Sequence, residues 1–232
     1  MAQVGSQTLG RGIRILELLA QSGEPQSIDS VARGLDVHRS VAYRLVRTLE
    51  EHGLVARDAA GQLVLGPGLA ALAVHVERDL QQAAVTELGS CADALEMTCL
   101  IALMMDAQNA VTLVSVSPRR SGAVISYRPG HRHPLTRGAP GKAILLGLPP
   151  TAWPADISPA LRSELSQARV DGYATSQGEV VSSLRAVAVP LPLPDRQPAS
   201  LAAIHVEFPH PPAEIAAQLE HTRDRIVRTL VV

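Results

Sequence analysis

Cations and hydroxyl groups gather on one face of a helix predicted over residues 39–52. At about 100° per residue, the apolar positions Ala42, Leu45, Val46 and Leu49 fall on one side, and a polar arc of roughly 140° lies opposite. Arginine can bind phosphate or read guanine edges, and hydroxyl groups can bond to phosphate or bases. We therefore predict that this face contacts double-stranded DNA, with a solvated arginine face on an ordinary helix as the alternative. The predicted contacts are His38, Arg39, Ser40 and Tyr43 to bases, and Arg44 and Arg47 to phosphates.

The segment around this face has the pattern of a helix-turn-helix. Residues 28–55 predict a short helix, a tight turn and a longer helix that ends at Gly53. Ser27 is the expected N-cap of the short helix, and Asp36 could cap the second one or oppose backbone phosphate. Residues 8–20 add a helix whose stripe begins at Leu9. The expected core of these helices is Ile13, Leu16, Leu19, Ile28, Val31, Leu45 and Leu49.

A predicted hairpin directly follows the second helix of this motif. Residues 54–57 and 62–65 are short apolar strands around a turn that contains Gly61. A hairpin in this place is typical of the wing of a winged helix-turn-helix. Arg57 would lie on the wing, either reaching a phosphate or the minor groove or simply facing solvent.

Composition limits how such a module could bind DNA. The chain of 232 residues has a net charge of -1, and residues 1–66 hold seven arginines and seven acids. Since phosphate neutralisation drives non-specific affinity, binding must come from a local patch and from dimerisation. Aromatic residues make up only 2%, which argues against base-stacking surfaces for single strands.

Other classes of protein find little support in the sequence. No signal peptide and no apolar run of 18 residues are visible, and Cys91 and Cys99 lack a metal-type spacing, so we expect a cytoplasmic protein with reduced, buried cysteines. No nucleophile elbow, P-loop or zinc-protease motif is present, so we expect neither an enzyme nor a cofactor. His131 and His133 form an HxH pair, for which ordinary loop histidines making hydrogen bonds are the simpler interpretation than metal ligands.

The remainder of the chain predicts a linker and an α+β domain. Residues 67–82 are expected to form a linker helix with an apolar stripe that packs on another subunit or on its own chain. Strands interrupted by helices, with hairpin order, favour an antiparallel sheet. Helices are expected at 84–95, 138–148, 160–168 and 212–230, a loop at 129–135, and strands at 98–105, 111–116, 123–127, 186–190 and 200–206.

Several segments, in order, resemble those of IclR-type transcriptional regulators. They are HRSVAYRLVRTLEEHGLVARD, GQLVLGPGLAALA, HPLTRGAPGKAILLG, DGYATSQGE and AVAVPLP. The resemblance implies a winged helix-turn-helix (1–66), a linker helix (67–82) and a GAF-like effector-binding domain (83–232). It further implies a homodimer or homotetramer that binds inverted-repeat operator DNA and represses a catabolic or metabolic operon. The effector would be an organic acid or an aromatic compound.

The resemblance also implies a pocket at the start of the helix near residue 139. Backbone amides of Gly138, Ala139, Pro140 and Gly141, with the helix dipole, would favour an anion there, although proline lacks one amide donor. Lys142 would add charge if it faces the pocket. By position the family pocket would also use Ser176, Ala186, His205 and Glu207.

His205 and Glu207 stand where the family often has small polar residues. A basic or hydroxylated ligand could suit this pair, but so would a tighter or vestigial pocket. Two alternatives therefore stay open: a winged-helix protein that acts without a ligand, and one that contacts only proteins.

Overall fold

The computed structural model describes residues 5–119 and 127–230. The strand expected over residues 123–127 lies, but for Tyr127, outside the described residues. The chain divides into two compact units, residues 1–78 and 79–232, each with its own hydrophobic core.

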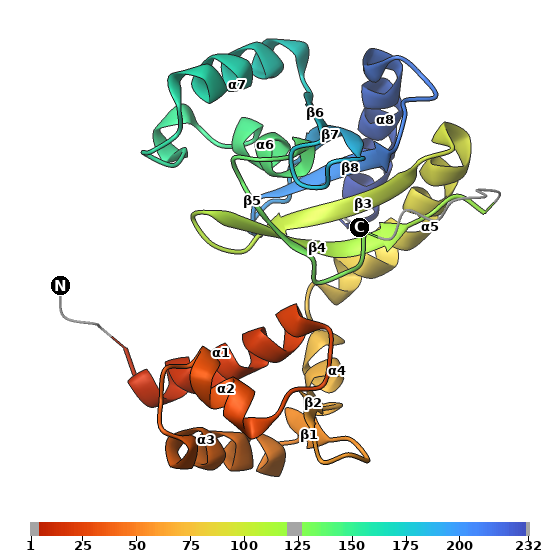
Figure 1. Ribbon diagram of the computed structural model, residues 1–232. Coiled ribbons are helices and arrows are strands. Elements are labelled where there is room, and N and C mark those ends of the chain that lie inside the picture. The colour runs from red at the N-terminus through yellow and green to blue at the C-terminus, as the bar shows by residue number, and fades with distance from the viewer. Residues whose placement is uncertain (1–4, 120–126, 231–232) are drawn as a thin grey trace. The chain divides into compact units, whose positions relative to one another are not determined.

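The first unit is the predicted winged helix-turn-helix (Figure 1). Its two strands pair antiparallel, and Leu63 of the second also bridges to Gln26. The turn between the strands is closed by Asp58, whose carboxylate accepts hydrogen bonds from the amides of Ala60 and Gln62. The elements are α1 (Gln7–Ser22), α2 (Ile28–Gly34), α3 (Arg39–Glu51), β1 (Val55–Arg57), β2 (Leu63–Leu65) and α4 (Gly68–Ala73).

Capping residues fix where the helices of this unit begin. The Ser27 hydroxyl accepts a hydrogen bond from the amide of Ser30 at 3.1 Å, as the sequence predicted. The cap of α3 is His38, whose Nδ1 accepts from the Ser40 amide at 3.3 Å. Asp36 is therefore not the cap. It lies in the turn between α2 and α3 with a φ of 52°, in the left-handed region that aspartate tolerates better than most residues.

The core of the first unit differs from the predicted one at α1. Ile15 is completely buried, whereas Ile13 is 50% exposed and Leu9 is 65% exposed. Ile15 and Leu19 are four residues apart and share a face, while Ile13 lies about 200° of helical rotation from Ile15. The inward face of α3 follows the prediction, since Ala42 and Val46 are fully buried. The core comprises Ile15, Leu19, Val31, Val46, Val55 and Leu63.

The continuous helix expected over residues 67–82 is instead two helices. Helix α4 ends at Ala73, Glu77 has a φ of 47°, and α5 begins at Arg78. Leu80 is fully buried in the core of the second unit, whereas Leu72 is 65% exposed. The apolar stripe therefore does not continue along one surface.

The second unit is built on a six-stranded antiparallel sheet in the order β5-β4-β3-β8-β7-β6. The predicted hairpin and the two late strands are present. Two short edge strands were not predicted: β5 lies inside the expected loop, and β6 follows Tyr173. The elements are α5 (Arg78–Leu95), β3 (Thr98–Met104), β4 (Asn109–Val116), β5 (Arg132–Pro134), α6 (Ala139–Leu146), a 3-10 turn (Pro150–Ala152), α7 (Pro159–Asp171), β6 (Ala174–Gln177), β7 (Arg185–Leu191), β8 (Ala199–His205) and α8 (Pro212–Leu230).

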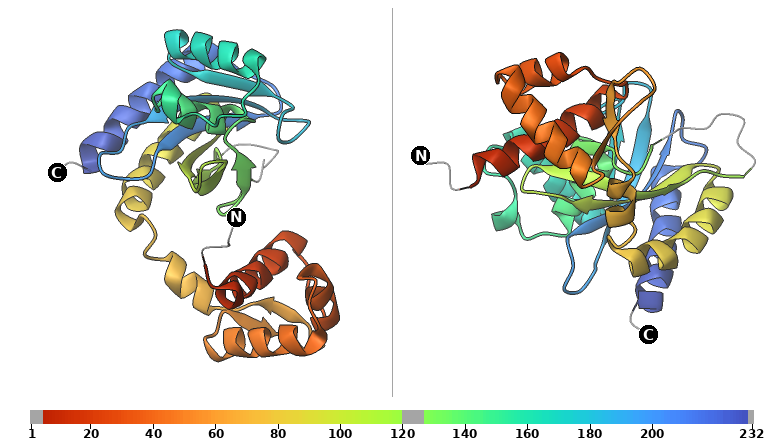
Figure 2. Two further views of the ribbon diagram at one scale, coloured as in Figure 1. Left: turned by 90° about the vertical axis from the view of Figure 1, so that its left-hand side faces the viewer. Right: turned by 90° about the horizontal axis from the view of Figure 1, so that it is seen from below.

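Helices cover both faces of this sheet (Figures 1 and 2). Alternation along β8 separates the two cores: Leu201 and Ala203 pack towards α5 and α8, whereas Ala202 and Ile204 pack towards α6 and α7. The central strands are buried on both faces, which explains their nearly unbroken apolar sequence. Among the described residues no helix is long and apolar enough to cross a membrane.

Candidate functional site

The polar face of α3 is assembled as predicted. The six predicted contacts from His38 to Arg47 are all exposed, and Tyr43 is 52% exposed. Helix α3 packs on α2, α1 and β1 through its opposite face. The structure thus presents three guanidinium groups, a phenol, an imidazole and a hydroxyl on one outer surface.

Two arginines of this face are held by carboxylates of the same unit. Arg39 Nε lies 3.3 Å from Asp29 Oδ1 of α2, and Arg47 Nε lies 3.3 Å from Glu51 Oε1 one turn along α3. Both pairs are well exposed, and such pairs contribute only about 0–1 kcal/mol. A DNA phosphate could therefore replace either carboxylate at small cost.

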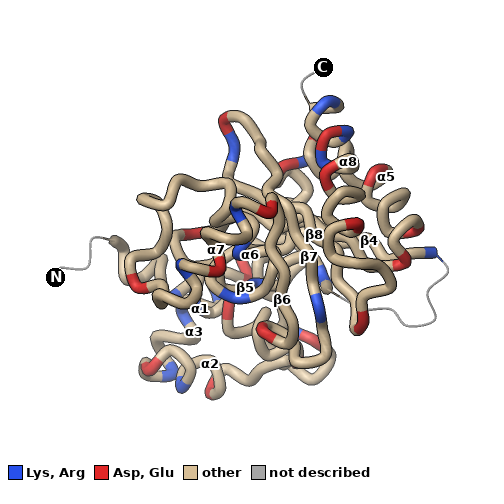
Figure 3. Tube along the Cα trace, turned by 90° about the horizontal axis from the view of Figure 1, so that it is seen from above, with Lys and Arg blue, Asp and Glu red and all other residues tan. Residues whose placement is uncertain are grey.

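Arg57 and Arg44 differ in how they are held. Arg57 Nε lies 2.8 Å from Glu50 Oε1, and its Nη1 donates to the carbonyl of Gly61 at 3.0 Å, which fixes the side chain along the wing. Arg44, by contrast, forms no ion pair with any of the residues that the structure describes. Among the described residues, Arg44 is therefore the uncompensated cation of α3. Over the rest of the chain, basic and acidic residues are interspersed (Figure 3).

His38 and Ser40 also have a structural task at the start of α3. Besides capping the helix, His38 Nδ1 lies 2.9 Å from Ser40 Oγ. The two side chains therefore hold each other at the exposed helix start. The sequence-based prediction assigned both residues to base contact and did not include the hydrogen bond between them. A serine two residues after a histidine at a helix start is a pattern that allows this bond.

In the second unit, four of the predicted effector residues line one small cavity. Gly138, Pro140, Ser176 and Ala186 line it, and the rest of the wall is formed by Tyr127, Glu179, Val180, Val181, Leu184, Arg185 and Ile204. Its volume is about 20 Å³, little more than one water molecule requires. Ala139 contributes its amide, which donates to Ser176 Oγ at 2.9 Å. The structure thus brings the start of α6, β6 and β7 together.

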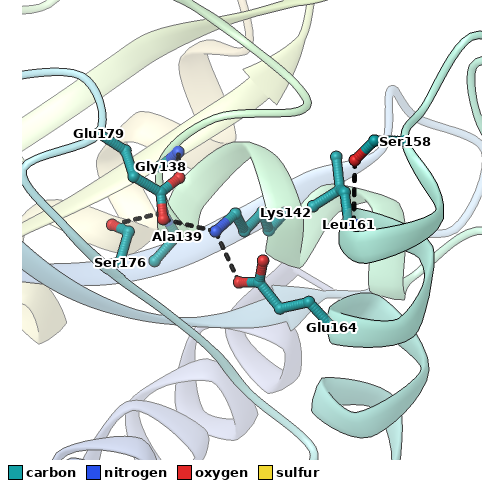
Figure 4. A network of polar contacts seen from close by, with 8 residues as sticks. All are labelled: Gly138, Ala139, Lys142, Ser158, Leu161, Glu164, Ser176 and Glu179. Atoms are coloured by element: carbon teal, nitrogen blue, oxygen red, sulfur yellow. Dashed lines mark hydrogen bonds and ion pairs between the residues drawn. The ribbon is translucent and has the colours of Figure 1, made fainter.

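The anion position at the start of α6 is filled by the chain's own Glu179. Its Oε2 accepts from the Gly138 amide at 2.9 Å, and its Oε1 lies 2.6 Å from Lys142 Nζ (Figure 4). Lys142 is only 3% exposed and also pairs with Glu164 Oε1 of α7 at 2.6 Å. Lys142 therefore binds two internal carboxylates. Glu179 was not a predicted site residue, although it lies in the DGYATSQGE segment.

Gly141 serves packing. A Cβ at Gly141 would lie 2.5 Å from the carbonyl oxygen of Pro134 and 2.8 Å from that of Leu135. Only glycine permits this approach of α6 to the chain after β5. Gly141 is not among the residues that line the cavity.

His205 and Glu207 do not face this cavity, contrary to the sequence-based prediction. Ile204 lines the cavity opposite Ala186, whereas His205 pairs in register with Arg185 on the other face of the sheet. Glu207 lies beyond the end of β8, and its amide donates to His205 Nδ1 at 3.1 Å. The prediction placed both residues on the strand without the register that decides which way each side chain points.

A larger cavity of about 440 Å³ lies on the α7 side of Lys142. Its titratable residues are Lys142 and three acids, Asp156, Glu164 and Glu179. The charge of Lys142 is shared by two of those carboxylates. This cavity is therefore unfavourable for an organic acid.

Three aromatic rings lie beside the small cavity. The Tyr127 ring is 4.5 Å from that of His131 and 6.2 Å from that of His133, centroid to centroid. His133 is 1% exposed, and neither ring nitrogen has a hydrogen-bond partner among the described residues, contrary to the ordinary hydrogen bonds that we expected. Thr112 Oγ1 is likewise buried and has no hydrogen-bond partner among the described residues.

Each buried polar group without a partner lowers the free energy of unfolding by about 1–3 kcal/mol. The described residues supply no cluster of three metal-binding side chains here or elsewhere.

Acid should destabilise the second unit through His133. Burial, with the nearby His131, lowers the pKa of His133 from 6.5 to about 4. Below pH 6.5 the unfolded chain therefore takes up the proton first, so stability falls progressively towards pH 4. Partial burial also lowers the pKa of His131, and burial raises the pKa of Tyr127 to about 12.

We expect His133 to remove about 2 kcal/mol from the free energy of unfolding between pH 7 and pH 5. Urea titrations that follow the fluorescence of Trp153, the single tryptophan, would measure this loss. His133→Leu should reduce the loss by that amount. An unchanged pH dependence in the variant would contradict the assignment.

The two cysteines lie on the opposite side of the sheet. Cys91 and Cys99 are buried free thiols with their sulfur atoms 3.6 Å apart, in the core below α5 and α8. They are small buried residues, as predicted, and do not contribute to the cavity.

Comparison with known proteins agrees with this architecture. Residues 8–59 match the IclR helix-turn-helix domain. The HTH-type transcriptional regulator Rv1719 of Mycobacterium tuberculosis is 30% identical over 198 residues, which cover 79% of this chain and 76% of the relative. The HTH-type transcriptional repressor AllR of Klebsiella pneumoniae is 28% identical over 208 residues, 81% of this chain and 75% of that protein.

Solved structures share the whole fold. An IclR transcriptional regulator from Alicyclobacillus acidocaldarius superposes with a TM-score of 0.83 at 23% identity, covering 97% of this chain and 99% of that one. An IclR homologue from Microbacterium hydrocarbonoxydans, complexed with 4-hydroxybenzoate, gives 0.81 at 21% identity with the same coverage. Residues 8–59 match the family's helix-turn-helix domain, and Rv1719 is 30% identical over 79% of this chain. The chain therefore belongs to the IclR family, whose members are DNA-binding transcriptional regulators and not enzymes.

Proposed function

We propose that this protein represses transcription of a catabolic or metabolic operon, and that a small organic acid or aromatic molecule bound beside α6 controls it. The exposed cationic face of α3, with a wing directly behind it, carries the DNA-binding part of the proposal. The repressor AllR and the 4-hydroxybenzoate complex of a structural neighbour support repression and a small-molecule effector. The role places the protein in the cytoplasm.

In the proposed complex α3 enters the major groove and the wing contacts the adjacent backbone. His38, Arg39, Ser40 and Tyr43 reach base edges from the first turns of the helix. Arg44, Arg47 and Arg57 bind phosphates. For Arg47 and Arg57, a phosphate oxygen takes the place of the carboxylate that now holds the guanidinium group, and for Arg39 a base edge does so.

Two copies are needed in this proposal, because a unit with little net charge binds DNA weakly by itself. The first unit exposes apolar side chains that a second copy could cover. Inverted half-sites in the DNA would then match the two-fold symmetry of the dimer. Two such dimers could pair into a tetramer. The exposed residues are Leu9 and Ile13 of α1, Leu72 of α4, and Val74 and Val76 after it.

The domain limits proposed for this function are residues 1–66 for DNA binding, 67–82 for the linker and 83–232 for effector binding. The turn at Glu77 lies within the proposed linker. Rotation there would change the spacing of two reading helices, which is how effector binding could change operator affinity.

Effector binding requires the small cavity to widen. A pocket for a ring compound occupies a few hundred Å³, against about 20 Å³ in this structure. The side chains of Val180, Val181 and Leu184 close one side and would have to move. An organic acid would also compete with the Glu179 carboxylate for the Gly138 amide.

Regulation without a ligand is a second candidate function. The small cavity volume and the Glu179 carboxylate at the α6 start favour it, since both leave little for a ligand to bind. In that case operator affinity would stay constant across a panel of organic acids and aromatic compounds.

Selection of binding sites from random duplex DNA tests the proposed function. The wild-type chain should enrich inverted repeats, and Arg39→Ala should lose about 1–3 kcal/mol of affinity and relax the preference at one base pair in each half-site. Arg14→Ala is a matched control, because Arg14 is an exposed arginine in an ion pair on α1. Failure to enrich any repeat, or an unchanged motif with Arg39→Ala, would contradict these assignments.

A further inference from the structure

The described side chains that are buried and lack a hydrogen-bond partner all lie in one place. They contribute three atoms: Thr112 Oγ1, His133 Nδ1 and His133 Nε2. Thr112 and His133 are both buried, at 1% exposure each. Folded proteins pair nearly all buried polar atoms with protein or water, so three unpaired atoms in one cluster indicate a position for a partner from outside the chain.

The backbone pairing of β4 and β5 places these two side chains on one wall. His133 pairs in register with Ala110, and the amide of Thr112 donates to the carbonyl of His131. Ala110 and Thr112 are two residues apart on β4, so both face the same side as His133. That side carries α6, because Ala110 belongs to the core beneath it.

Tyr127 joins this wall to the small cavity. Its ring lines the cavity together with Gly138 and Pro140, and it stands edge-on to the His133 ring at 6.2 Å. The cavity is also lined by the apolar side chains of Val180, Val181, Leu184 and Ile204, and by three polar residues, Ser176, Glu179 and Arg185. The cavity and the cluster are therefore adjacent, with Tyr127 between them.

The charges around this region disfavour an anion. Lys142 binds Glu164 and Glu179, and the Glu179 carboxylate itself contacts the Gly138 amide. Arg185 lines the cavity, but its guanidinium lies over the ring of Phe208, whose side chain packs into the core under α8. The Arg137 guanidinium donates to the carbonyl oxygen of Glu179. Burial lowers the pKa of His133 to about 4, so its ring is neutral near pH 7.

We propose that Thr112 and His133 form the polar end of the effector site and bind the hydroxyl group of a neutral ring compound, of which phenol is the simplest. The proposal rests on the function proposed above, because it takes the cavity beside α6 as the effector site. A neutral imidazole has one acceptor and one donor, and a threonine hydroxyl has both. The ligand hydroxyl can therefore donate to the unprotonated ring nitrogen of His133 while it accepts from the hydroxyl group of Thr112. The ring of the ligand packs against Tyr127 and Ile204.

Calorimetric titration of the full chain, without DNA, tests this. Phenol, toluene and benzoate have similar rings but carry a hydroxyl, a methyl and a carboxylate. We expect phenol to bind about five- to tenfold tighter than toluene, since one net hydrogen bond is worth about that ratio. We expect benzoate to bind more weakly than phenol.

Two variants assign the discrimination to these residues. His133→Leu and Thr112→Val keep the volume and remove the polar atoms, and each should bring the ratio of phenol to toluene affinity close to one while toluene still binds. Val170→Ala is a matched control, because Val170 is 82% exposed on α7 and should leave the ratio unchanged. Thr112→Val preserves the test if His133→Leu does not fold.

The proposal is overturned if phenol and toluene bind equally, if neither binds, if benzoate binds tightest, or if both variants keep the wild-type ratio. Titration of operator DNA with and without phenol separates this outcome from the proposed function. Phenol bound through His133 with no change in operator affinity would contradict effector control but retain the binding site. Operator binding that responds to benzoate alone would retain effector control and reject the neutral ligand.

Discussion

Replacing Arg44 with alanine should weaken binding to every DNA sequence, by about 1 kcal/mol for each half-site. Of the four arginines on α3 and the wing, Arg44 is the one without a carboxylate partner among the described residues. Its full charge is therefore available to a phosphate. In a two-site complex the loss of affinity should approach thirtyfold, because it corresponds to about 2 kcal/mol. The slope of log affinity against log salt should fall by about one for each phosphate that Arg44 no longer neutralises.

Fluorescence anisotropy with selected and scrambled duplexes at several salt concentrations would measure both effects. Arg44→Ala should reduce affinity for both duplexes by the same factor, which distinguishes binding to phosphate from base reading. Arg14→Ala again serves as the control with the same change in net charge. A loss confined to the selected duplex would show that Arg44 reads a base, and unchanged affinity would remove it from the interface.

Replacing Lys142 with methionine should destabilise the second unit by about 3 kcal/mol. The Lys142 side chain is 3% exposed and joins Glu164 of α7 to Glu179, which in turn holds the Gly138 amide at the start of α6 (Figure 4). Removing one partner of a buried ion pair costs about 3–5 kcal/mol, because the remaining charge is left uncompensated. The lower end applies here, since the side chains of both glutamates are partly exposed.

Urea unfolding followed by Trp153 fluorescence reports on this unit alone. Trp153 is the single tryptophan, and its Nε1 donates to the Leu145 carbonyl of α6 at 2.7 Å. Glu164→Gln is the matched control: its side chain is 48% exposed, so we expect a loss of less than about 1 kcal/mol. Equal losses for the two variants would mean that the buried ammonium group contributes no more than a surface pair.

Several features of this protein follow from local sequence. Ala42 and Val46 lie inward and Tyr43 and Arg44 outward because helical periodicity alone separates them. The cap at Ser27 likewise depends on a hydroxyl three residues before a free amide. Continuous apolar runs indicate the central strands. Such features involve residues within about one turn or one strand, so the sequence pattern contains the interaction that makes them.

Local sequence patterns did not predict the edge strands β5 and β6 or the end of α4. Strand β5 has the sequence Arg-His-Pro, which has little strand character, and it forms because Asn109 to Val111 of β4 offer it a free edge. The turn at Glu77 carries no glycine or proline signal. It lets Leu80 enter the core of the second unit, a gain that depends on residues far along the chain.

Tertiary structure also decided the composition of the candidate sites. The resemblance to the family placed Gly138, Pro140, Ser176 and Ala186 at one cavity, but strand register turned His205 to the other face. The carboxylates that hold Arg39 and Lys142 come from other elements, and so does the pairing that leaves His133 and Thr112 buried together without partners. Periodicity specifies which residues of one element share a face. Which faces meet, and which charges they bring together, depends on packing between elements distant in the sequence.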